Sequence, residues 1–113
     1  MSKRVEMVNS LLQREVGKII QRQMIFSGSP LVTLTRVDTS ANLMEAKVYI
    51  STFPEEKTET VLKTLNDSVF DIQQQINKRL KMRPVPKIKF IKDAAISGAA
   101  RIEEILRKTK NEK

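Results

Sequence analysis

The spacing of apolar residues divides the chain into helical and extended segments. Between residue 3 and about residue 25, apolar side chains recur every three or four positions, which predicts an amphipathic helix: Val5, Val8, Leu12, Val16 and Ile19. The turn-forming residues from Ser27 to Pro30 then predict the end of that helix.

Two extended segments follow the first helix. Residues 31–39 are rich in β-branched types, and residues 44–52 alternate between apolar and polar side chains. The short connection at residues 40–42 favours an antiparallel hairpin. In the second strand Tyr49 falls on the polar face.

A long helical pattern covers residues 55–81. A straight helix of that length would measure about 40 Å, longer than the roughly 34 Å diameter expected of a compact domain of this size. Ser68, a weak helix former, lies near its middle. We therefore predict a break or kink at Asp67–Phe70.

The sequence from residue 86 to the end predicts a strand, a short helix and a tail. In residues 86–92, Lys87 and Lys89 alternate with apolar residues, which favours a positively charged open sheet face. Asp93 can cap a final helix, and residues 107–113 predict a frayed basic tail after a domain spanning 1–106. The expected class is α+β, with a mixed three-stranded sheet, helices on one face and the order α-β-β-α-α-β.

Composition narrows the chemistry. The 113 residues include no Cys, His or Trp, which removes disulfides, thiol nucleophiles and imidazole bases. We expect neither an enzyme nor a bound metal or cofactor. The chain has no apolar run long enough for a membrane span, and Met1–Arg4 lead into charged helical sequence. These features predict a cytoplasmic monomer.

The formal charge of +8 is unevenly distributed. Residues 38–71 have a net charge of −4, whereas residues 72–92 hold no acid and seven bases: Lys78, Arg79, Lys81, Arg83, Lys87, Lys89 and Lys92. Clustered bases without acids indicate a polyanion-binding site. We expect these seven cations to gather on one side of the protein.

Within this group, the strongest candidates for phosphate contact are four residues around the end of the third helix: Lys78, Arg79, Lys81 and Arg83. The candidates on the third strand are Lys87 and Lys89, and those that extend the patch along the first helix are Lys3, Arg4, Arg14, Lys18 and Arg22. Three functions stay open: an RNA-binding assembly factor, a general nucleic-acid binder, or a protein-interaction module whose charge aids solubility.

Several ordered segments resemble the ribosome-binding factor A family over nearly the whole chain. The resemblance rests on residues 31–40, on Ala46–Ser51, on the run Arg83-Pro-Val-Pro-Lys-Ile-Lys-Phe90, and on five positions beyond it: Asp93, Ile96, Gly98, Arg101 and Ile102. It implies a type-II KH-like fold that binds the immature small ribosomal subunit and helps the 5′-end region of its ribosomal RNA mature. A GTPase or an initiation factor is the implied agent of release.

The chain departs from the family pattern at two places. Where the family has an Ala-x-Gly interhelical kink, this chain has Ser68, Val69 and Phe70. Where the family tends to have Arg, one residue after Ile72, this chain has Gln73. The resemblance thus predicts a kink at Ser68 and places the positive charge further along the third helix.

Overall fold

A computed structural model describes residues 2–94 of the chain. In chain order its elements are α1 (Lys3–Gln23), β1 (Leu31–Thr39), β2 (Glu45–Phe53), the short 3-10 helix η1 (Glu55–Lys57), α2 (Thr58–Asp67), α3 (Val69–Arg79) and β3 (Lys87–Lys92). The predicted final helix, the domain limit at residue 106 and the tail at 107–113 lie outside the described residues. Within residues 2–94 no helix is both long and apolar enough to cross a membrane.

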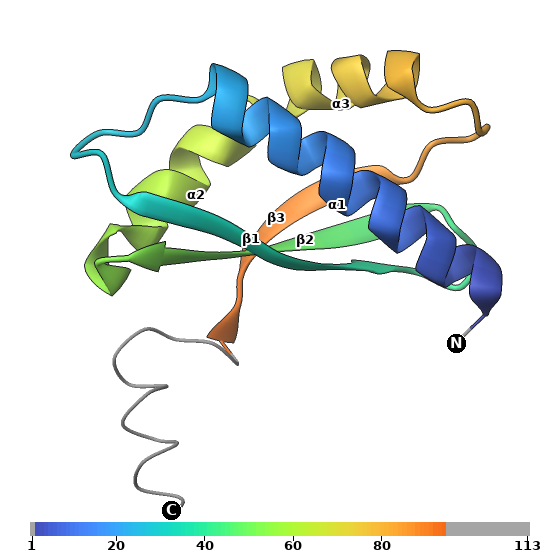
Figure 1. The fold of residues 1–113 in the computed structure, drawn as a ribbon, viewed down its shortest axis with the longest axis horizontal. Helices are drawn as coiled ribbons and strands as arrows, with labels where there is room; N and C mark the ends of the chain where they lie inside the picture. The colour runs from blue at the N-terminus through green and yellow to red at the C-terminus, as the bar shows by residue number, and fades with distance from the viewer. Residues whose placement is uncertain (1, 95–113) are drawn as a thin grey trace, which may run out of the picture.

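The three strands form one mixed sheet in the order β1-β2-β3. The central strand β2 pairs antiparallel with β1, for example Val37 with Val48, and parallel with β3, for example Lys47 with Lys89. The helices cover one face of this sheet (Figure 1). The predicted α-β-β-α-α-β order and the type-II KH-like fold are therefore confirmed.

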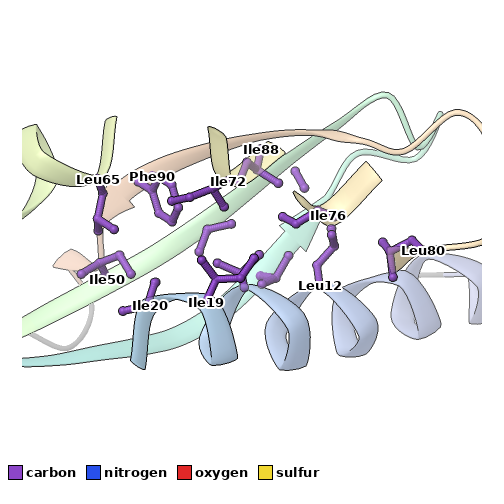
Figure 2. Packing of buried hydrophobic residues seen from close by; sticks show 14 of the residues in the cluster. Leu12, Ile19, Ile20, Ile50, Leu65, Ile72, Ile76, Leu80, Ile88 and Phe90 are labelled. Atoms are coloured by element: carbon purple, nitrogen blue, oxygen red, sulfur yellow. The ribbon is translucent and has the colours of Figure 1, made fainter. Parts of the chain in front are cut away.

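One hydrophobic core fills the space between the helices and the sheet (Figure 2). The sheet contributes the inward residues of each strand, among them Ile50 and Phe90, because successive side chains of a strand point to opposite faces. The helices contribute fully buried side chains such as Leu12, Leu65 and Ile76. The alternation therefore leaves the polar residues of β2 and β3 on the opposite, helix-free face.

The predicted break between the second and third helices falls at Ser68. This residue leaves helical geometry, with φ −101° and ψ 6°, while its N–H still donates to the carbonyls of Thr64 and Leu65. The change of direction lets α3 return to α1, where the amides of Gln75 and Gln23 bond each other at 2.9 Å. The end of α3 is thereby carried alongside α1.

An irregularity in β1 was not predicted. The register with β2 shifts between Leu34 and Arg36, so Thr35 is an extra residue in β1. Such β-bulges re-aim the side chains that follow them. In this sheet the bulge places Arg36, rather than Thr35, opposite Tyr49.

Candidate RNA-binding interface

Eight predicted phosphate-contacting residues lie toward one end of the molecule. In Figure 1 the beginning of α1, the last turn of α3 and the loop that leads into β3 all lie toward the right of the view. The last turn of α3 lies beside the middle of α1, where Arg79 contacts Glu15. We call this region the cationic end and define it by Lys3, Arg4, Lys78, Arg79, Lys81, Arg83, Lys87 and Lys89. All eight side chains are exposed to solvent.

The expectation that seven cations share one side is wrong in two respects. Lys87 and Lys89 alternate with the buried Ile88 and Phe90, so they lie on the open sheet face, whereas Lys78 and Arg79 belong to a helix that packs on the other face. The cationic end therefore wraps around the end of the sheet. Lys92 is not part of it, since its Nζ lies 3.5 Å from the Glu55 carboxylate at the far end of β3.

The carboxylate of Glu15 forms ion pairs with three cations of α1 and α3. Glu15 of α1 lies 3.4 Å from Arg79 of α3, 3.3 Å from Arg14 and 3.8 Å from Lys18. Burial alone would raise the pKa of Glu15, but the hydrogen bond from Arg79 and the charges of Lys18 and Arg14 outweigh it and lower that pKa. Two of the proposed extension residues, Arg14 and Lys18, are thus joined to Arg79.

The lowered pKa of Glu15 makes its stabilising effect depend on pH. A carboxyl whose folded-state pKa lies below its ordinary value of 4.5 stabilises the fold above that pH and loses this effect as the pH falls through the lowered value. Wild-type protein should therefore be more stable than Glu15→Gln at neutral pH, with the difference shrinking in acid. Urea unfolding of both proteins across this pH range checks it, and a difference that persists unchanged in acid would count against the pairing.

Gln73 of α3 has a structural role. Its Nε2 donates to the carbonyl of Pro86 at 3.0 Å, and its Oε1 accepts the N–H of Ile88 at 2.9 Å. One side chain thereby fixes the beginning of β3 against α3. This contact sets where Lys87 enters the open face.

Replacing Gln73 with leucine should lower the free energy of unfolding by about 1–3 kcal/mol, because two polar backbone groups lose their partners. The matched control is Gln74→Leu, on the exposed side of the same helix. Chemical denaturation of the two variants measures the difference. Equal stabilities would show that the Gln73 amide does not hold β3.

The open sheet face is hollowed at the cationic end. A cavity of about 480 Å³ is lined by charged side chains of all three strands, with three lysines and two acids: Lys47, Lys87, Lys89, Asp38 and Glu45. Asp38 lies opposite Lys47, and Glu45 lies opposite Lys87. The two acids therefore reduce the net positive charge of this face. The run of bases in residues 72–92 did not predict this reduction, because both acids come from other strands.

The kink offers little charge for binding. Ser68 and Val69 are half-buried, and Val69 packs against the core, while the Phe70 side chain is 74% exposed. Val69 and Phe70 begin α3 directly after the break. The kink residues thus present an apolar ring rather than cations.

Sequence reasoning missed two residues of the open face, Arg36 and Lys47. Both are exposed, and Arg36 lies over the ring of Tyr49. A signal was present in β1, where the inward apolar residues Val32, Leu34 and Val37 are spaced by two and then by three positions. Such a change of phase indicates an inserted residue.

Comparison with known proteins identifies relatives over the whole chain. The ribosome-binding factor A family model matches residues 4–106. A ribosome-binding factor A from Chlorobium phaeovibrioides is 35% identical over 116 residues, covering 99% of this chain and 96% of that protein. Another from Thermodesulfovibrio yellowstonii is 32% identical over 108 residues, covering 96% of this chain and 92% of that protein.

Solved structures have the same fold. The solution structure of a Thermotoga maritima protein matches with a TM-score of 0.69 and 29% identity, covering 85% of this chain and 92% of that one. The crystal structure of ribosome-binding factor A from Thermus thermophilus matches with a TM-score of 0.65 and 23% identity, over 78% of this chain and 94% of that one.

Proposed function

Because this chain belongs to the ribosome-binding factor A family, we propose that it is an RNA-binding factor that binds the immature small ribosomal subunit through its cationic end. In this role it assists the maturation of the 5′-end region of the small-subunit ribosomal RNA. It acts by binding, without catalysis, and leaves with the help of a GTPase or an initiation factor.

The observation that carries the proposal is the cationic end itself. Its exposed cations come from segments as far apart in sequence as Lys3 and Lys89, and none of them is needed for the core. Exposed lysine and arginine side chains from several segments can contact several phosphates at once, and phosphate contacts supply most of the affinity for nucleic-acid backbone. Positive residues that served only solubility would not have to lie close together on the surface.

A related protein supports the choice of partner. A homology model of Thermus thermophilus ribosome-binding factor A has been fitted into the cryo-EM map of a 30S–ribosome-binding factor A complex. That protein has the fold described above, with a TM-score of 0.61 at 24% identity. The small subunit is therefore the partner that we propose for this chain.

Sedimentation with ribosomal particles tests the proposal. We expect the protein to sediment with free or immature small subunits more than with mature ones, and the binding to weaken as salt is raised. A slope of log K on log salt of roughly −3.5 to −4.5 would correspond to about five phosphate contacts. Equal binding to unrelated duplexes would indicate a general nucleic-acid binder, and binding that salt does not affect would indicate a protein-interaction module.

A further inference from the structure

The open sheet face carries a stacked pair of side chains. The Cζ atom of Arg36 lies 3.7 Å from the centre of the Tyr49 ring, so the guanidinium lies over the ring face. The bulge at Thr35 creates this pair, since without the register shift Arg36 would not lie opposite Tyr49. Bulges that re-aim a side chain in this way are common beside binding sites.

The guanidinium of Arg36 also forms an ion pair with a buried carboxylate. Its Nε lies 3.9 Å from Oδ2 of Asp93, whose side chain is only 1% exposed. The hydroxyl of Thr35, the bulge residue, donates a hydrogen bond to the same carboxylate oxygen. The Arg36 side chain is nevertheless 51% exposed. The sheet therefore presents to solvent a planar cation that lies over the Tyr49 ring and close to a buried carboxylate.

Two lysines lie next to each other on one side of this stacked pair. Lys47 precedes Tyr49 by two residues on the same face of β2, about 7 Å away along the strand, and pairs in register with Lys89 of β3. Both lysine side chains are exposed. The acid in this row is Asp38, opposite Lys47. A stacking plane beside two cations matches the chemistry of a nucleotide, which has a flat base and a phosphate.

We propose that the outer face of Arg36, backed by Tyr49, stacks on an unpaired base of single-stranded RNA, while Lys47 and Lys89 contact the adjoining phosphates. The proposal rests on the proposed function and adds a second kind of contact to it. The cationic end binds backbone without regard to bases, whereas this site requires a base that is free of pairing. In this proposal the open sheet face binds single-stranded RNA.

The first test compares two ligands on the full-length wild-type protein: a short oligoadenylate and an abasic oligonucleotide of equal length. The two carry the same phosphates, so they differ only in what can stack. We expect the oligoadenylate to bind about tenfold more tightly, because a stacked base typically contributes that much or more. Tyr49 is the single tyrosine of the chain, so its ring signals in NMR report directly on the site. They should shift with oligoadenylate and stay in place with the abasic strand.

A conservative variant separates the plane from the charge. Arg36→Lys keeps the positive charge and removes the planar guanidinium. We expect it to lose the preference for oligoadenylate while its affinity for the abasic strand is unchanged. Lys63→Arg exchanges the same two side-chain types at an exposed position of α2 outside the cationic end, so it is the matched control and should keep the preference.

The outcomes of these tests separate a failure of the stacking site from a failure of the proposed RNA-binding function. Equal affinity for the two strands, with Tyr49 signals unmoved and salt-dependent binding intact, would overturn the stacking site and leave the proposed function standing. A preference for oligoadenylate that survives in Arg36→Lys would also overturn it. Absence of salt-dependent binding to either strand would remove both proposals. The wild-type comparison holds even if a variant folds poorly.

Discussion

Replacing Lys78, Lys81 and Arg83 with alanine should weaken RNA binding about a hundredfold at ~0.1 M salt, because each lost phosphate contact removes about 0.7–0.9 from the slope of log K on log salt. The slope should flatten by about 2–3. The side chains of Lys78 and Lys81 are exposed and outside the core, so each of these two substitutions should change the free energy of unfolding by less than about 0.5 kcal/mol. Arg83 donates hydrogen bonds to the carbonyls of Leu80 and Met82, so its replacement should lower the free energy of unfolding by about 1 kcal/mol. Affinity measured over a salt series gives both quantities.

A second triple variant is the control for net charge. Lys57, Lys63 and Lys92 lie in η1, in α2 and at the last residue of β3, away from the cationic end (Figure 1). Replacing them with alanine removes the same three charges. We expect the salt slope of this control to stay close to that of the wild type. Equal losses in the two triple variants would show that affinity follows total charge rather than the cationic end.

Replacing Ile76 with alanine should lower the free energy of unfolding by about 2–5 kcal/mol, since the side chain is completely buried and its removal leaves a cavity. That loss is a large share of the ~5–15 kcal/mol that stabilises a typical domain. Ile76 lies among core residues of the helices and the sheet (Figure 2), so α3 is the element that loses its packing. Urea unfolding followed by circular dichroism measures the change.

Phe70 provides the matched control on the same helix. Its side chain is 74% exposed, so Phe70→Ala should change stability by no more than about 0.5 kcal/mol. Comparable losses in Ile76→Ala and Phe70→Ala would contradict the assignment of α3's buried face. Such a result would also contradict the placement of Lys78 at the exposed end of α3.

The elements were predictable because they depend on local patterns. The helical period predicted α1, and the alternation around Lys87 and Lys89 predicted β3. The length of a straight helix over residues 55–81, together with Ser68 near its middle, predicted the break at Asp67–Phe70 that the structure has at Ser68. Each of these arguments uses neighbours along the chain. The polar face of Tyr49 followed from the same alternation.

The arrangement of the site was less predictable because it depends on how distant segments meet. Arg79 and Glu15 are 64 residues apart, and their contact exists only because α3 turns back onto α1. The pairing of Arg36 with Tyr49 requires a bulge that shifts one strand by one residue. The division of cations between helix layer and open face likewise requires knowing which face of the sheet α3 covers.

Lysine footprinting in the complex tests the central claim most directly. The protein, free and bound to immature small subunits, is treated with a lysine-acylating reagent, and the modification of each lysine is read by mass spectrometry. We expect protection of Lys78, Lys81, Lys87 and Lys89, with Lys57 and Lys63 as reactive in the complex as in the free protein. Protection of Lys57 and Lys63, with the lysines of the cationic end still reactive, would contradict the proposed interface.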